Sequence, residues 1–202
     1  MSSYLLTLQR RFACAAYRRN TNFIRIPTTV IGLIDASVSI KVAVNYGNYK
    51  NRLGAYHAPM HTFLDFQFLR TLPEGQVRNG FAELIKISSC AHLRTFDLLD
   101  QFCEKLITTR FGRSDDATDD VRKAADEINR SGIYEMLKLE TPNLHEIGLD
   151  RVIAYGHTWS PLHEVSSYAH LVSKSLQVPS LLPTFRYATA MPSPSTWHTQ
   201  QH

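Results

Sequence analysis

The residues of this chain that could do chemistry lie in two short motifs, Ala82-Glu83-Leu84-Ile85-Lys86 and Tyr155-Gly156-His157-Thr158. Glu83 and Lys86 are one helical turn apart, so on a helix they would share a face. Their apolar neighbours indicate a charged pair at the border of a core, and a plain surface ion pair is the alternative. His157 is either a metal ligand or an ordinary solvated imidazole. A carboxylate and an imidazole both suit zinc, which keeps one coordination position open in catalytic sites.

A second set of polar residues stands before Gly54, in four short segments. These segments are Arg18-Arg19, Pro27-Thr28-Thr29, Asp35 to Lys41, and Lys50-Asn51. Each is a weak signal by itself, because two threonines before an apolar run can simply cap a helix. Together they are a stronger signal, because they occur in this order along the chain and are followed by the Glu83 and His157 motifs.

Taken in this order, the motifs resemble those of the sugar phosphate cyclases, the family of 3-dehydroquinate synthase. The resemblance implies a lyase that converts a sugar phosphate into a carbocycle and releases phosphate. It also implies two cofactors, NAD and zinc or another divalent metal such as cobalt, and a homodimer in the full-length family. The partner molecule is then a sugar phosphate, and neither nucleic acid nor a membrane is expected.

The resemblance also implies roles for individual residues. Glu83 and His157 correspond to metal ligands, and Lys86, Asp35 and Lys41 correspond to catalytic residues. The family's cofactor contacts correspond here to Thr28, Thr29, Asp35, Lys41 and Lys50. Its substrate contacts correspond to Arg19, Asn51 and Lys86.

Three positions near His157 depart from 3-dehydroquinate synthases, which carry Arg, Asn and a second His where this chain has Asp150, Ala154 and Pro161. The segment from Glu140 to Glu146 departs as well. These features resemble cyclases that take sedoheptulose 7-phosphate. Ala154 favours the demethyl-4-deoxygadusol synthase type, which belongs to mycosporine biosynthesis, over the 2-epi-5-epi-valiolone synthase type. A 3-dehydroquinate synthase of the shikimate pathway and a non-catalytic interaction module are the alternatives.

Two parts of the family pattern have no counterpart in the sequence. No Gly precedes Gly32, so the glycine-rich phosphate loop of the NAD-binding half is missing, as is the helix with the third metal-ligating His. We therefore expect a fragment that is inactive alone, unless another chain supplies the NAD half. Read one nucleotide earlier, the codons permitted by residues 186–199 can spell a likeness of that helix. Our hypothesis is that residues 165–177 are translated intron and that the remaining tail is out of frame.

The pattern of apolar residues predicts an α/β fold followed by an α fold. Residues 1–72 would be the strand-rich C-terminal part of the NAD-binding domain, residues 73–164 an incomplete helical metal and substrate domain, and residues 165–202 a disordered tail. The expected strands are 23–26, 42–46, 53–56 and 62–66, and residues 30–34 form a buried element. The expected helices are 77–90, 92–108 and 121–139, with Thr71 capping the first. The third has Ala124, Ile128, Ile133 and Leu137 spaced for a buried stripe. Residues 111–120 are expected to be a surface loop.

Composition limits the remaining possibilities. The chain has 202 residues, a formal net charge of +4 and dispersed rather than clustered basic residues, which does not indicate nucleic-acid binding. It shows no secretory signal and no apolar run near the roughly 20 residues of a membrane span. Its three cysteines have no disulfide spacing. We therefore expect a cytoplasmic protein.

Overall fold

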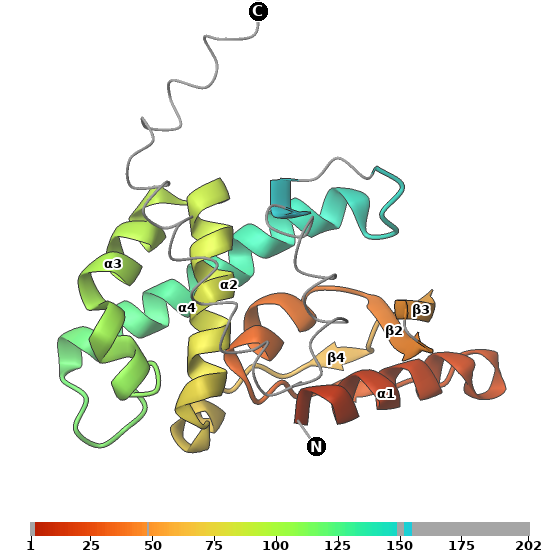
Figure 1. Cartoon of the computed structure of the whole chain (residues 1–202), viewed down its shortest axis with the longest axis horizontal. Coiled ribbons are helices and arrows are strands. Elements are labelled where there is room, and N and C mark those ends of the chain that lie inside the picture. Colours follow the sequence, from red (N-terminus) through yellow and green to blue (C-terminus); the bar gives the residue numbers. More distant parts are fainter. Residues whose placement is uncertain (1–2, 48, 149–151, 155–202) are drawn as a thin grey trace, which may run out of the picture.

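The structure is a computed structural model that describes residues 3–47, 49–148 and 152–154. Two kinds of structure follow one another along the chain (Figure 1). All the described strands precede Glu74, and three long helices follow it. The elements in chain order are α1 Ser3–Ala16, η1 Tyr17–Arg19, β1 Ile24–Arg25, η2 Gly32–Ala36, β2 Lys41–Tyr46, β3 Tyr49–Tyr56, β4 His61–Thr62, η3 Phe66–Thr71, α2 Glu74–Ala91, α3 Leu93–Thr108, α4 Asp119–Glu140, η4 Thr141–Asn143 and η5 Val152–Ala154.

The strands β2 and β3 form an antiparallel hairpin that packs against α1. Val42 pairs with Ala55 and is 1% exposed, so it faces the protein while the hairpin end reaches solvent. Gly47 has a φ of 58°, which a glycine adopts without strain in the connecting turn. The strands predicted over residues 42–46 and 53–56 are confirmed, and the second begins four residues earlier than expected. The helix α1 was not predicted, so the first part of the chain is less strand-rich than we expected.

The strands β1 and β4 form a parallel pair of only two residues each. The prediction of a strand over residues 62–66 is therefore wrong beyond Thr62. The physical reason is a local cap: Asp65 Oδ1 accepts a hydrogen bond from the Gln67 backbone N–H at 2.9 Å and starts the helical turn η3.

The helices α2, α3 and α4 pack on one another, and α4 also packs on η2 (Figure 1). Pro73, not Thr71, precedes α2, because Thr71 closes η3; the predicted Thr71 cap is wrong. His92 begins α3 by accepting the Thr95 N–H on Nδ1 at 3.2 Å. Fully buried side chains from all these elements share one core, which includes Leu33, Ile34, Leu69, Leu84, Leu99, Leu106, Phe111 and Ile128.

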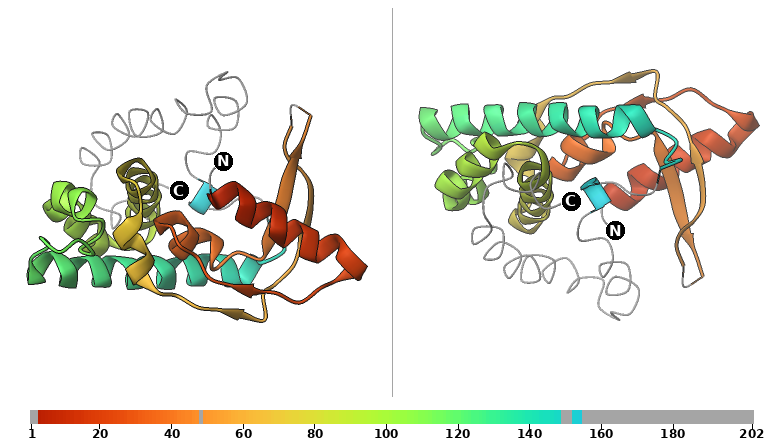
Figure 2. Two further views of the ribbon diagram at one scale, coloured as in Figure 1. Left: turned by 90° about the horizontal axis from the view of Figure 1, so that it is seen from below. Right: turned by 90° about the horizontal axis from the view of Figure 1, so that it is seen from above.

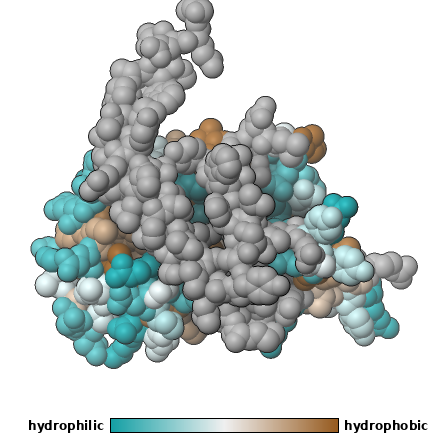
Figure 3. All heavy atoms as spheres, viewed as in Figure 1, coloured by the Kyte–Doolittle hydropathy of each residue, from teal (hydrophilic) through white to brown (hydrophobic). Residues whose placement is uncertain are grey.

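Two predictions about the helical part need correction. The segment after α3 is not a simple surface loop, because Phe111 is 0% exposed and anchors it in the core beside Phe81. On α4 the predicted buried position Leu137 is 44% exposed, and Met136 takes the core position instead. In the view of Figure 3, hydrophilic side chains dominate the surface around α3 and this loop.

Within the described residues no helix has both the length and the apolarity to cross a membrane. Cys14, Cys90 and Cys103 are all free and partly buried, and burial raises the pKa of the Cys90 and Cys103 thiols.

Candidate active site

The helix α2 holds the charged pair that the sequence singled out. Lys86 Nζ lies 2.6 Å from Glu83 Oε1, one helical turn away, and the two side chains are only 10% and 20% exposed. The interpretation of a polar site at the border of a core is therefore confirmed, and the surface ion pair is excluded.

A glycine brings this part of α2 close to Val30, two residues before η2. A Cβ on Gly80 would lie 2.1 Å from the Val30 Cβ, far inside van der Waals contact. Only a residue without a side chain allows α2 to approach so closely. The turn η2 carries Asp35, so this contact brings the Asp35 carboxylate toward the Glu83–Lys86 pair.

The pKa of Glu83 reports this convergence of charges. Burial raises the pKa of the Glu83 carboxyl, and the Asp35 carboxylate raises it further, while the Lys86 and Lys41 ammonium groups oppose the shift. Charges from α2, η2 and β2 therefore all act electrostatically on the Glu83 carboxyl. We call Asp35, Lys41, Glu83 and Lys86 the charge junction.

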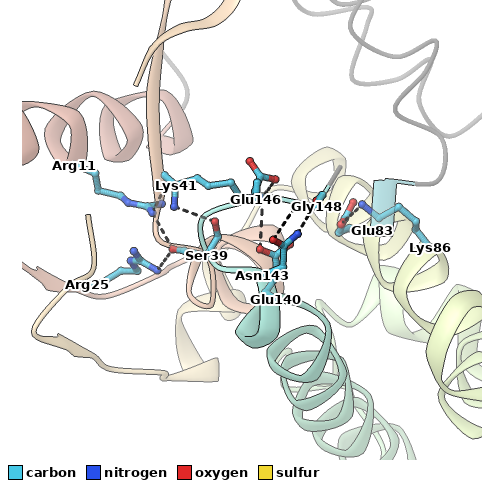
Figure 4. A network of polar contacts seen from close by, with 10 residues as sticks. All are labelled: Arg11, Arg25, Ser39, Lys41, Glu83, Lys86, Glu140, Asn143, Glu146 and Gly148. Carbon is cyan, nitrogen blue, oxygen red and sulfur yellow. Dashed lines mark hydrogen bonds and ion pairs between the residues drawn. The ribbon is translucent and has the colours of Figure 1, made fainter. Parts of the chain in front are cut away.

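Lys41 at the start of β2 pairs with two carboxylates, one from the last residue of α4, Glu140, and one from Glu146 in the segment after it (Figure 4). Its Nζ lies 3.0 Å from Glu146 Oε1 and 3.6 Å from Glu140 Oε2. Glu140 is 3% exposed, and Glu146 has a φ of 52° that turns the chain back toward Lys41. The sequence showed this segment only as a departure from the family; two glutamates flanking a Pro-Asn turn were the available signal.

An asparagine closes the turn that presents Glu146. Asn143 Nδ2 donates to the Gly148 carbonyl at 2.7 Å, and the Gly148 N–H donates to Asn143 Oδ1 at 3.1 Å (Figure 4). The Glu146 N–H also donates to the Asn143 carbonyl at 2.9 Å. These local hydrogen bonds hold the turn that presents Glu146 to Lys41. We call Glu140 and Glu146 the clamp on Lys41.

Two buried arginines fix the backbone that leads into Lys41. Arg11 donates to the Ser39 and Lys41 carbonyls at 3.1 and 2.9 Å, and Arg25 donates to the Ser39 carbonyl (Figure 4). Arg25 also donates to the Ala36 carbonyl. Burial, together with the neighbouring Arg11 charge, lowers the pKa of Arg25 to about 9. Sequence reasoning missed both residues, because their partners are backbone carbonyls that no side-chain motif reveals.

The remaining predicted residues are not tied to the charge junction by any described contact. Thr29 is buried, and its Oγ1 accepts the Gly32 N–H at 3.0 Å, as the capping alternative predicted. Thr28 is exposed. Asn51 is exposed in the hairpin, where its N–H donates to Asn45 Oδ1 at 2.9 Å. Lys50 lies beside it in β3.

The side chains of the other two candidates, Arg19 and His157, are not among those that the structure describes. Arg19 ends η1, and only its backbone is placed. His157 lies outside the described residues, as do Asp150, Pro161 and the tail whose frame we questioned.

The described residues provide only part of a binding site for a divalent metal at Glu83. Residues 3–47, 49–148 and 152–154 contain no cluster of three His, Cys, Asp or Glu side chains able to hold a metal ion. Glu83 nevertheless is a buried carboxylate whose ionised form is disfavoured, so a bound cation would compensate a charge that burial penalises. Glu83 can thus serve as one metal ligand, and the described residues alone do not complete the set of ligands.

Glu83 makes the stability of the protein depend on pH in an unusual direction. Because its pKa is raised in the folded state, the folded protein holds more protons than the unfolded chain between the usual carboxyl pKa and the raised one. The free energy of unfolding should therefore fall as pH rises through this interval. Glu83→Gln should remove that fall, as measured by urea unfolding at a series of pH values.

Glu127 on α4 provides a control of opposite sign. A hydrogen bond from Arg94 lowers the pKa of the Glu127 carboxyl, so its contribution is present above the usual carboxyl pKa and is lost as pH falls. Glu127→Gln should therefore remove stability at neutral pH and leave the Glu83 effect in place. Identical pH profiles for the wild type and Glu83→Gln would contradict the assignment.

Comparisons with known proteins show which family the chain resembles. A family model described as 3-dehydroquinate synthase N-terminal matches residues 8–79. The chain is 60% identical over 155 residues to the demethyl-4-deoxygadusol synthase of Trichormus variabilis. It is 40% identical over 161 residues to a 2-epi-5-epi-valiolone synthase from Actinomyces sp. These matches cover 77% and 79% of this chain, but only 38% and 41% of the relatives.

A solved structure has the same arrangement of elements. The 2-epi-5-epi-valiolone synthase from Streptomyces hygroscopicus subsp. jinggangensis, solved with NAD+ and Zn2+ bound, matches with a TM-score of 0.77 and 36% identity. The match covers 85% of this chain and 45% of that one. A 2-deoxy-scyllo-inosose synthase, at 22% identity and a TM-score of 0.61, shares the fold.

The fold is that of the cyclases related to 3-dehydroquinate synthase. The chain belongs to the sugar phosphate cyclase family, and the predicted group of demethyl-4-deoxygadusol and 2-epi-5-epi-valiolone synthases is confirmed. It spans about two-fifths of the length of the curated relatives that it matches, 38% and 41% for the two above.

Proposed function

We propose that the charge junction is the metal and substrate end of a cyclase site that acts on sedoheptulose 7-phosphate. The product would be a cyclitol such as demethyl-4-deoxygadusol, formed with release of phosphate. The observation that carries the proposal is the 2.6 Å ion pair of Lys86 and Glu83 at the border of the core, and the charges of Asp35 and Lys41, from two further elements, that act on the same carboxyl support it. The 60% identity to a demethyl-4-deoxygadusol synthase supports this choice of product.

Each residue of the junction has a proposed role. Glu83 would hold the metal together with His157, and the positive charge of the metal would offset the burial that disfavours the ionised Glu83 carboxylate. Lys86 then faces the substrate and neutralises its negative charge. Asp35 and Lys41 contact cofactor and substrate. When bound, NAD accepts and returns a hydride, and the metal polarises the oxygen of the transiently oxidised carbon.

The surroundings of Lys41 favour substrate hydroxyl groups over a substrate carboxylate. Glu140 and Glu146 both face the Lys41 ammonium, so the junction and its clamp carry four carboxylates against two ammonium groups. A substrate carboxylate placed here would meet like charges, whereas hydroxyl groups can donate hydrogen bonds to them. This electrostatic balance supports sedoheptulose 7-phosphate over the substrate of 3-dehydroquinate synthase.

The remaining assignments belong to the same proposal. Thr28, Thr29 and Lys50 contact NAD, and Arg19 and Asn51 contact the substrate. Residues 1–72 are the C-terminal part of an α/β NAD-binding domain, and residues 73–164 belong to the helical metal and substrate domain. The full-length protein is a homodimer in the cytoplasm.

The experiment is a product assay with sedoheptulose 7-phosphate, NAD+ and Zn2+, followed by mass spectrometry and by measurement of released phosphate. Because this chain spans 38% of its demethyl-4-deoxygadusol synthase relative, the assay supplies the rest of that relative as a second polypeptide. We expect a cyclised product that Lys86→Met abolishes and Lys105→Met, on α3, does not. Release of phosphate without a cyclised product would contradict the proposal.

A further inference from the structure

The stretch between η2 and β2, residues 37–40, belongs to no helix or strand and joins two residues of the charge junction. Asp35 lies in η2 just before it, and Lys41 begins β2 directly after it. We call residues 37–40 the connection. Ser39 within it is 5% exposed, so its backbone polar groups need partners inside the protein.

Two buried arginines from different elements supply such partners (Figure 4). Arg25 on β1 donates to the Ser39 carbonyl at 3.1 Å and also to the Ala36 carbonyl. Arg11 on α1 donates to the same Ser39 carbonyl at 3.1 Å and to the Lys41 carbonyl at 2.9 Å. Both views of Figure 2 show α1 alongside the β2–β3 hairpin, and α1 packs on β2. The connection is therefore held from two sides by side chains that lie far away in the sequence.

The position of Arg25 is costly for the folded state. Arg25 is 3% exposed, and in the described part of the chain no carboxylate pairs with it and its Nε and Nη2 have no hydrogen-bond partner. Burial and then the neighbouring Arg11 charge lower its pKa. The Phe23 ring, 5.7 Å from Arg25 Cζ, offsets only part of this cost. A buried charge without an ionic partner destabilises a fold, so stability alone gives no reason for a guanidinium at this place.

We propose that Arg25, together with Arg11, is a positioning residue of the charge junction, which fixes the connection so that Asp35 and Lys41 keep the places that the reaction needs. The proposal rests on the proposed function, in which these two residues contact cofactor and substrate. Lys41 is then fixed at both ends, because Arg11 holds its carbonyl and the clamp holds its ammonium group. A displacement of about 1 Å can lower a reaction rate about 100-fold, which gives these hydrogen bonds their weight for the reaction.

The experiment measures by NMR, at low temperature, how fast the protons of the Lys41 ammonium group exchange with water, and it requires neither cofactor nor substrate. Lys41→Met assigns the signal by its loss. Arg25→Met should free the connection, loosen the pairing of Lys41 with the clamp and speed this exchange at least tenfold. Circular dichroism establishes that each variant is folded, so that a general loss of structure is not mistaken for this effect.

Arg122 provides the matched control, because it too donates to two backbone carbonyls. Its hydrogen bonds, at 3.1 and 3.2 Å, hold the loop before α4. Arg122→Met should therefore leave the exchange of the Lys41 ammonium protons unchanged. Arg11→Met is the second variant for the connection. It removes the donor to the Lys41 carbonyl itself and should speed the exchange even where Arg25→Met fails to fold.

The product assay described above gives an independent readout. Arg25→Met should lower kcat at least tenfold and change the KM for sedoheptulose 7-phosphate less than twofold, because displaced groups lose contacts that form only in the transition state. Arg122→Met should leave both constants unchanged.

The possible results separate the positioning from the function. Unchanged Lys41 exchange in every folded variant of Arg11 and Arg25 overturns the proposal, and so does an equal acceleration in Arg122→Met. Faster exchange together with an unchanged kcat also overturns it, because the place of Lys41 then has no bearing on the reaction. Faster exchange as expected, with no cyclised product even from the wild-type chain, upholds the positioning of Lys41 and contradicts the proposed function.

Discussion

Replacing Gly80 by alanine is expected to destabilise the protein by about 3 kcal/mol, the upper end of the cost of overpacking a core. The new Cβ would lie 2.1 Å from the Val30 Cβ and 2.4 Å from the Val30 Cγ1. Val30 is 0% exposed and packs in the shared core, so it has little room to move. The substitution should therefore push α2 away from η2 and separate Asp35 from Glu83.

Gly75 provides the control in the same helix. A Cβ there meets no atom within 4 Å, so Gly75→Ala should cause no loss of stability and can gain helix propensity. Both variants can be measured by urea unfolding followed by circular dichroism. Equal stability of Gly80→Ala and Gly75→Ala would show that α2 and η2 do not approach as closely as described.

Replacing Lys41 by methionine is expected to cost about 2 kcal/mol of unfolding free energy. Removing one partner of a fully buried ion pair costs about 3–5 kcal/mol, and solvent screening lowers this figure because the Lys41 side chain is 33% exposed. The loss follows because Glu140, at 3% exposure, keeps its carboxylate in the protein while the facing ammonium is gone. The triple variant Lys41→Met, Glu140→Gln, Glu146→Gln should recover part of the loss.

An exposed ion pair is the control for the contribution of burial to the cost of Lys41→Met. Arg78 pairs with Glu74 across one turn of α2, and the side chains are 49% and 53% exposed. Arg78→Met should therefore cost no more than about 0.5 kcal/mol. If Lys41→Met and Arg78→Met cost the same, the clamp of Glu140 and Glu146 on Lys41 contributes nothing beyond a surface pair.

The sequence predicted the elements whose apolar period is strong. The helices around Leu84, Leu99 and Ile128 and the β2–β3 hairpin lie where they were expected. It failed where a short polar contact decides the backbone, as at Asp65, whose side chain starts η3 within the stretch predicted to be a strand. It also placed Leu137 in the core, because one residue of drift along a long helix changes the buried face.

The sequence predicted those residues of the candidate site that belong to a recognisable motif. The pair Glu83–Lys86 was found through its apolar neighbours, and the structure places it at the border of the core. Glu140, Glu146, Arg11 and Arg25 were not found, because their partners lie far along the sequence and are a lysine or backbone carbonyls. Such contacts depend on the tertiary fold and leave no local pattern.

The central claim is that Asp35, Lys41, Glu83 and Lys86 form one electrostatic unit, and NMR titration of the Glu83 side-chain carboxyl carbon tests it most directly. The account predicts that Glu83 titrates above the usual carboxyl range, that Asp35→Asn moves its pKa down, and that Lys41→Met moves it further up. A Glu83 carboxyl that titrates in the usual range and responds to neither substitution would contradict the account.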